Sequence, residues 1–163
     1  MAYDMFLKIE GIEGESQDDT HAGEIDILKW QWGMKQAGSM HRGGGGGAGK
    51  VEINDVTFTH LVDKATGNLM LYCANGKHIP EACFVVRKVG ETPLEYFKIT
   101  MKKCIVTSVN SGGESGEGGH DLLTEDFTLN FAEVKVEYME QGEDGTGSAG
   151  PEFSWNIAKN VAA

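Results

Sequence analysis

The chain has 163 residues and a mass of 17.6 kDa, which allows one domain with its own core but not two ordinary domains. Hydrophobic residues make up 40% and charged residues 24%, so the composition excludes wholesale disorder. Acidic residues outnumber basic ones by 25 to 14. The resulting formal net charge of −11 disfavours a nucleic acid partner, because the phosphates of such a partner would be repelled.

We expect no secretory signal, because the first residues carry neither a basic region nor a long apolar run. No window approaches the roughly 20 apolar residues that a membrane helix needs. Cys73, Cys83 and Cys104 are an odd number of cysteines without CxxC spacing, and their apolar neighbours predict reduced, mostly buried thiols. These features predict a protein that folds in the cytoplasm without membrane insertion.

Alternating apolar and polar residues predict antiparallel strands along most of the chain. Residues 5–9 alternate strictly. Residues 25–32 alternate with a slip of one position near Leu28, which is typical of a β-bulge. Residues 51–58 show a similar slip, and residues 97–102 have a clear period of two.

The strongest strand pattern covers residues 126–140. Its apolar positions shift by one at residues 132–133, which predicts one long, bent strand with a wetter opposite face. A last short strand is expected at residues 153–157.

Residues 66–75 are the one stretch with a helical pattern. Thr66 is the expected N-cap, and Gly76 is the expected end. Leu69, Met70 and Cys73 are expected on the buried face. So short a helix needs tertiary packing to persist.

Glycine accounts for 23 residues, and 16 of them lie in the tracts 38–49, 111–119 and 142–150. Glycine costs too much backbone entropy inside regular elements, so these tracts predict loops at about 36–50, 111–119 and 141–150. Bent strands between glycine-rich loops favour a single domain over residues 1–163. We expect it to be mainly β: an antiparallel β-barrel of bent strands with one short α-helix packed on its side.

Residues 44–50 fit the first seven positions of the phosphate-binding pattern GxxxxGK[ST]. Val51 occupies the eighth position and has no hydroxyl for magnesium. The pattern also needs a helix after it, whereas strand periodicity follows here. A flexible loop is therefore favoured over nucleotide binding.

The histidines show no metal-ligand spacing; they are His21, His41, His60, His78 and His120. A Cys–His nucleophile could still assemble in three dimensions, but buried thiols and solvated histidines are favoured. The carboxylates are dispersed and are expected on the solvated surface. We therefore expect no catalytic residue, no metal site and no cofactor, and thus no enzyme.

The glycine loop carries a local concentration of positive charge on an acidic body. Loops presented by a rigid scaffold carry function, and a cationic loop on an acidic body is suited to docking on another copy of that body. A disordered hairpin connection is the alternative. The expected contact residues are Gln36, Ser39, Met40, His41, Arg42, Gly43, Gly47 and Lys50.

Several segments, in their order and spacing, resemble the haemolysin-coregulated proteins (Hcp) of the bacterial type VI secretion system. They are residues 4–9, 14–16, 21–26, 30–34, 38–41 with the glycine run that follows, 68–71, 76–78, 129–132 and 155–157. The resemblance covers essentially the whole chain. It departs from the family pattern mainly at 111–119 and 141–150, which leaves open which effectors are carried.

The resemblance implies a barrel with a helix on its side, six copies closing into a ring, and rings stacking into a hollow tube. A contractile sheath would surround the tube, a spike protein would tip it, and the lumen would hold small effector proteins. Secretion would then need no signal peptide. Lys29 and Gln31 point away from Trp30 and Trp32, and we expect that pair to line the lumen as effector contacts.

Two other functions remain open from the residues alone. A nucleotide-using enzyme built on residues 44–50 would show itself in an ATP titration. A monomeric β-barrel that binds a ligand without enzymatic activity would show itself in size-exclusion chromatography.

Overall fold

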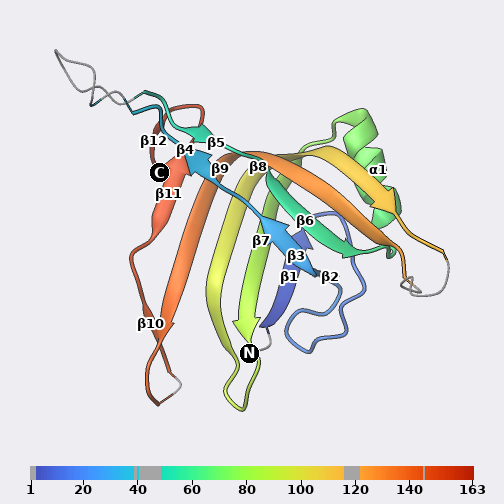
Figure 1. The fold of residues 1–163 in the computed structure, drawn as a ribbon, viewed down its shortest axis with the longest axis horizontal. Helices are drawn as coiled ribbons and strands as arrows, with labels where there is room; N and C mark the ends of the chain where they lie inside the picture. Colours follow the sequence, from blue (N-terminus) through green and yellow to red (C-terminus); the bar gives the residue numbers. More distant parts are fainter. Residues whose placement is uncertain (1–2, 39, 41–48, 116–121, 145) are drawn as a thin grey trace.

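The computed structural model describes residues 3–38, 40, 49–115, 122–144 and 146–163. In this part of the chain most elements are antiparallel strands, and one is a helix (Figure 1). The elements are β1 (Tyr3–Ile9), β2 (Ile25–Asp26), β3 (Lys29–Gln31), β4 (Met34–Lys35), β5 (Glu52–Ile53), β6 (Val56–Leu61), α1 (Thr66–Asn75), β7 (Ile79–Lys88), β8 (Leu94–Gly112), β9 (Thr124–Gln141), β10 (Gly147–Ala149), β11 (Phe153–Asn156) and β12 (Val161–Ala162).

The main sheet curls into a barrel around the core. Strands β1, β7, β8, β9 and β6 pair in that order, each antiparallel to the next. Strand β2 pairs with β1 and β3 pairs with β6, so the segment 25–31 joins the two ends of the sheet. Between β2 and β3 the joining segment stays bonded to both sides: the Ile27 amide donates to the Met5 carbonyl at 2.9 Å, and the Leu28 amide donates to the Thr59 carbonyl at 2.8 Å.

The predicted slip in the segment 25–32 is confirmed. Ile25 and Ile27 are buried, Leu28 is 53% exposed, and Trp30 packs on the core from the following strand. The change of parity at Leu28 coincides with the transfer of the chain from β1 to β6. A break between β2 and β3, with a bend at Leu28 in place of the expected β-bulge, therefore lets one segment pair with both ends of the sheet.

Strands β8 and β9 have 19 and 18 residues and extend beyond the barrel. The first half of β9 pairs with β6 and the second half with β11. The shift predicted near residues 132–133 is confirmed, because Phe131 and Val134 are both buried. Cys104 and Met101 on β8 lie directly opposite them, so the two strands change parity together. The hairpin therefore bends at one level.

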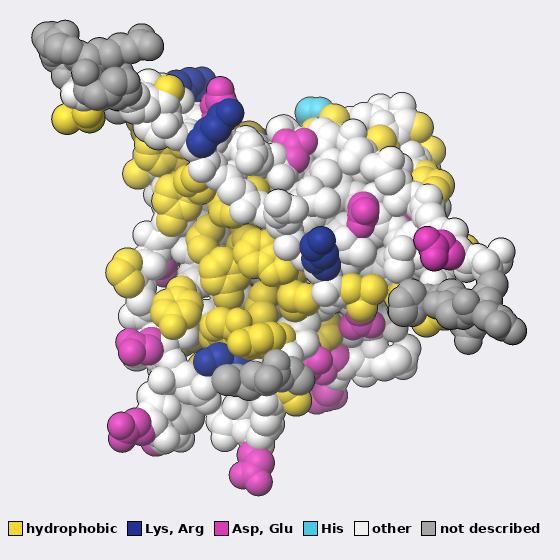
Figure 2. Space-filling view, viewed as in Figure 1, with side chains coloured by type: hydrophobic (Ala, Val, Ile, Leu, Met, Phe, Trp, Pro, Cys, Tyr) yellow, Lys and Arg dark blue, Asp and Glu magenta, His cyan; other side chains and the backbone are white. Residues whose placement is uncertain are grey.

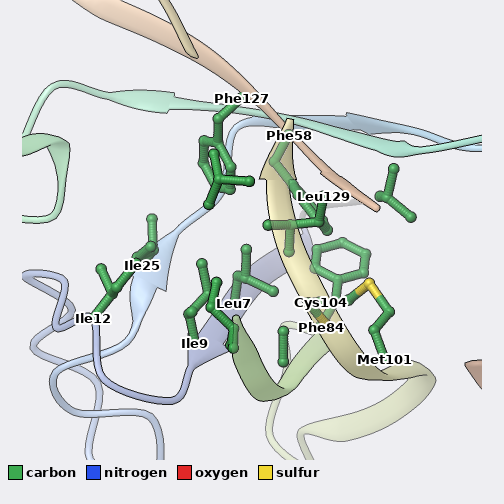
Figure 3. Close-up of a cluster of buried hydrophobic side chains, with 14 of the residues drawn as sticks. Leu7, Ile9, Ile12, Ile25, Phe58, Phe84, Met101, Cys104, Phe127 and Leu129 are labelled. Atoms are coloured by element: carbon green, nitrogen blue, oxygen red, sulfur yellow. The ribbon is translucent and has the colours of Figure 1, made fainter. Parts of the chain in front are cut away.

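The barrel interior is filled by aliphatic and aromatic side chains from every wall (Figure 3). Phe58 and Phe84 are fully buried with ring centroids 5.1 Å apart, and Phe127 packs on Phe58 at 5.6 Å. Fully buried side chains of this size each stabilise a core by about 1.5–3 kcal/mol. The predicted strand alternation is thus the pattern that fills this core.

Helix α1 has the predicted bounds and packs against β8, but two of its expected details are wrong. The N-cap is Ala65 rather than Thr66, whose side-chain oxygen instead accepts a bond from the Asp63 amide. The buried face consists of Leu69 and Tyr72, while Met70 is 45% exposed. Met70 lies one position from Leu69, a rotation of about 100° around the helix axis, which turns it away from the narrow face that packs on β8.

Gly76 ends α1 in the left-handed conformation, with φ of +67°, as predicted. Two of the expected glycine-rich loops are shorter than the sequence indicated, because β8 runs to Gly112 and β10 forms at Gly147–Ala149 beside β9. Pairing with the end of β9 gives that glycine-containing segment partners for its backbone groups. The three cysteines are free thiols: Cys104 is buried and the other two are half-buried.

No helix in the described ranges is both long enough and apolar enough to cross a membrane.

Candidate functional site

The outward side of β3, β6 and β9, with the adjoining part of β8, carries short polar side chains. We call this surface the hydroxyl face. It consists of Lys29, Gln31, Asp55, Thr57, Thr59, Thr107, Ser108, Asp126, Thr128 and Asn130.

Strand register brings these residues together. Gln31 lies opposite Thr57, and Thr57 lies opposite Thr128. In the next outward row, Lys29 lies opposite Thr59 and Thr59 opposite Asp126. Because side chains alternate between the two faces of a strand, the buried residues of β6 leave Thr57 and Thr59 on the outer surface.

Most polar groups of the hydroxyl face bond to one another. The Thr59 hydroxyl donates to Asp126 Oδ1 at 2.5 Å. The Thr128 hydroxyl lies 2.6 Å from that of Thr107 and 2.7 Å from that of Ser108. A second protein gains little by bonding to these paired hydroxyls, because it must first break the bonds they make.

Two residues depart from this pattern. Lys29 and Gln31 are exposed, and within the described part of the chain their side chains have neither a hydrogen bond nor an ion pair. Both point away from the half-buried Trp30 and Trp32, as the sequence predicted. These two side chains are therefore free to contact another molecule, and their assignment to a lumen stays a prediction.

A pocket of about 340 Å³ adjoins Gln31. Asp55, Thr57, Asn54, Trp32 and Gly33 complete its lining. The Trp32 indole nitrogen donates to the Asn54 carbonyl at 2.8 Å, which fixes the bend between β5 and β6 beside the pocket.

A second surface is apolar, and we call it the open aromatic face. The rows of side chains that point into the barrel continue along β8, β9 and β11. There the segment 25–31 no longer covers them. Phe97 lies opposite Tyr138, Val136 opposite Phe153, and Val134 opposite Trp155. The members are Trp32, Phe97, Val136, Tyr138, Phe153 and Trp155.

Figure 2 shows hydrophobic side chains gathered over the region where Figure 1 places β7, β8, β9 and β11. Tyr138 is 46% exposed, and Phe153 and Trp155 stack with centroids 6.3 Å apart at the surface. Contiguous exposed apolar surface of this kind marks an interaction site in proteins that are stable in water.

Strands β4 and β5 form a separate two-stranded hairpin that projects from the barrel (Figure 1). Of the predicted stacking residues, Gln36, Met40 and Lys50 are exposed, and Met40 is 82% exposed. The other predicted contacts lie outside the described residues; they are Ser39, His41, Arg42, Gly43 and Gly47. Strand β5 follows Val51, which agrees with the strand expected after the phosphate-loop-like run.

The expectation of solvated histidines is wrong for His60 and His21. His60 is fully buried, and its Nε2 lies 2.9 Å from Oε1 of the equally buried Glu125. His21 is 8% exposed, stacks on Phe6, and lies between the carboxylates of Glu24 and Glu95 at 2.8 and 2.6 Å. Glu24 is three residues from His21, but Glu95 and Glu125 lie 74 and 65 positions from their histidines, so no local pattern in the sequence predicted those two contacts.

Glu125 likewise overturns the expectation that the carboxylates lie on the solvated surface. Its second oxygen accepts a bond from the Ser111 hydroxyl at 2.6 Å. Among the described residues, no group of three or more His, Cys, Asp and Glu side chains could hold a metal ion.

The fold and its surfaces together define a class of protein: a bent antiparallel β-barrel domain with one packed helix. Its candidate sites are the hydroxyl face and the open aromatic face. A family model described as type VI secretion system effector, Hcp, matches residues 6–138. The chain belongs to the Hcp family of type VI secretion proteins, as its resemblance indicated.

Individual relatives agree. The chain is 54% identical to protein hcp1 of Pseudomonas aeruginosa over the full length of both. It matches the crystal structure of Hcp1 from Salmonella typhimurium with a TM-score of 0.78 and 38% identity, again over all of both chains. A type VI secretion system effector from Yersinia pestis matches with a TM-score of 0.73 and 32% identity, covering 94% of this chain and 100% of that one.

Proposed function

We propose that this protein is the structural tube subunit of a type VI secretion system, with six copies forming a ring and rings stacking into a hollow tube. The observation that carries the proposal is the open aromatic face, which continues the core beyond the barrel. Burying Tyr138, Phe153 and Trp155 against a neighbouring copy removes this surface from water. A contact between different faces of successive copies closes into a ring when the rotation permits.

In this ring the hydroxyl face lines the lumen, where Lys29 and Gln31 contact a small effector protein. Its mutually bonded hydroxyls offer a wet surface with few unpaired groups, which suits a channel that must also release its contents. The partners are then further copies of the chain, effector proteins, a contractile sheath and a spike protein. The tube assembles in the cytoplasm and leaves the cell through the secretion system.

The projecting β4–β5 hairpin and its glycine loop provide the contact between rings. A ring of six chains carries six times a formal charge of −11, so free rings repel one another. Salt screens such charges over about 8 Å at physiological ionic strength, which leaves short-range contacts to decide stacking. We expect light scattering to show stacking that increases with ionic strength, and stacking that weakens with added salt contradicts this.

Ring formation is tested on the purified chain by electron microscopy of stained particles and by size-exclusion chromatography with light scattering. We expect rings with a central hole. Tyr138→Arg should yield folded monomers, because a charge then lies on the open aromatic face. Val89→Arg is the matched control, since Val89 is 53% exposed in the turn between β7 and β8. A monomeric wild-type chain, or particles without a hole, would refute the proposal.

Reversing the charges of Arg42 and Lys50 together separates stacking from ring closure. We expect rings that no longer grow into tubes. If the rings themselves dissociate, the loop belongs to the contact within a ring.

A further inference from the structure

We propose that the pocket beside Gln31 binds an arginine side chain of the effector protein through the carboxylate of Asp55. This inference rests on the proposed function, because it names the chemistry that the lumen recognises. It also predicts that cargo proteins present an arginine to the wall of the ring.

Asp55 is a prearranged carboxylate. The Thr107 hydroxyl donates to its Oδ2 at 2.8 Å, and the Asn130 amide nitrogen donates to its Oδ1 at 2.8 Å. These donors come from β8 and β9, so the two strands hold the carboxylate in one orientation. An ionised carboxylate has about four acceptor positions, and two bonds leave room for two more. The remaining pair can accept the two parallel N–H groups of a guanidinium.

The pocket around this carboxylate has the size and lining for one side chain. Its volume of about 340 Å³ lies at the lower end of the range for small-ligand pockets. Arginine, unlike lysine, presents a planar fork of N–H donors that matches the two free acceptor positions of the carboxylate. The Gln31 amide and the Thr57 hydroxyl stand at the same pocket and can accept further N–H groups.

Charge favours the same occupant. No basic side chain lies in the pocket lining, and the chain as a whole carries −11. In a ring, the pocket recurs six times around the lumen, so an effector with several arginines gains affinity from simultaneous contacts. Each contact alone stays weak, which permits release.

The proposal differs from a purely structural role for Asp55. Stabilising the bend between β5 and β6 requires only the hydrogen bonds from Thr107 and Asn130, and an asparagine at position 55 can keep much of that stabilisation. Binding of a guanidinium requires the negative charge. The charge-neutral variant therefore separates the two roles.

The experiment titrates the purified, assembled protein with a fluorescein-labelled peptide Gly-Gly-Arg-Gly-Gly, followed by fluorescence anisotropy at low ionic strength. A second peptide carries citrulline in place of arginine, which removes the positive charge and keeps nearly the same shape. We expect the citrulline peptide, and the arginine peptide with the Asp55→Asn variant, to bind about tenfold or more weakly. Asp126→Asn is the control, because it removes one charge from the hydroxyl face outside the pocket and should leave binding within about twofold.

Electron microscopy of the same samples keeps this test distinct from that of the proposed function. Equal binding of the two peptides, or equal weakening by Asp126→Asn and Asp55→Asn, overturns the arginine pocket even if rings form. A preference for arginine that survives where no rings form overturns the tube proposal and supports the pocket. If Asp55→Asn melts near the wild-type temperature, its weaker binding comes from the lost charge and not from a loss of folding.

Discussion

Removing the carboxylate of Glu125 should destabilise this protein more than any surface charge substitution. Glu125 and His60 are both fully buried, and Glu125 accepts bonds from His60 Nε2 at 2.9 Å and from the Ser111 hydroxyl at 2.6 Å. Phe127 packs edge-on against the His60 ring, with centroids 5.2 Å apart. Glu125→Ala therefore leaves the buried His60 Nε2 without its partner, whereas the exposed Ser111 hydroxyl can bond to water instead.

The expected loss follows from these contacts. Leaving a buried polar group without its hydrogen-bond partner costs about 1–3 kcal/mol. A domain is stable by about 5–15 kcal/mol, so a loss of this size is a measurable part of the total. For a chain of this size each kcal/mol lowers the melting temperature by about 2–4 °C, which predicts a decrease of roughly 2–12 °C.

Urea unfolding followed by tryptophan fluorescence measures this loss. It is repeated at several protein concentrations, because association adds a concentration-dependent contribution to stability. Glu137→Ala is the matched control on the same strand; Glu137 pairs with Lys135 at the surface, and such a pair contributes at most about 1 kcal/mol. Replacing His60 and Glu125 together by leucine should recover much of the loss, because neither polar group is then left alone. A loss for Glu125→Ala no larger than that of the control would refute a buried hydrogen bond between His60 and Glu125.

Three further predictions concern single side chains. Burial raises the pKa of Cys104 to about 12, so iodoacetamide should label this thiol at pH 8 only after unfolding. Keeping the thiol neutral stabilises the folded protein fully below pH 9, and this contribution is lost as the pH rises toward 12. The Arg87 guanidinium holds the pKa of Asp18 below its ordinary value of 3.8. The ion pair therefore stabilises the folded protein above pH 3.8, and this stability is lost as the pH falls. Arg87→Lys should move the midpoint of acid unfolding to higher pH. A Cβ at Gly14 would clash with the backbone carbonyl oxygen of Glu24, so Gly14→Ala should lower the melting temperature. Gly67→Ala in α1 meets no neighbouring atom and should add about 0.5–1 kcal/mol of stability; equal effects of the two substitutions would contradict the described packing.

Local patterns in the sequence determined the elements and much of their orientation. The alternation of apolar residues with its slip at Leu28, the helix ending at Gly76 and the outward direction of Lys29 and Gln31 all depend on residues within a few positions of one another. These features follow from the period of a strand or a helix, which a short window of sequence records.

Tertiary structure alone decided which distant side chains meet. Glu125 lies 65 positions from His60, and Asp55 lies 52 and 75 positions from Thr107 and Asn130. Their contacts depend on the register between β6, β8 and β9, which no single strand encodes. The same register determines where the core ends and the open aromatic face begins, because the segment 25–31 covers only part of the sheet. The alternation of residues along one strand determines which side of the sheet a residue faces. Only the register with the neighbouring strands determines which side chains it meets on that side.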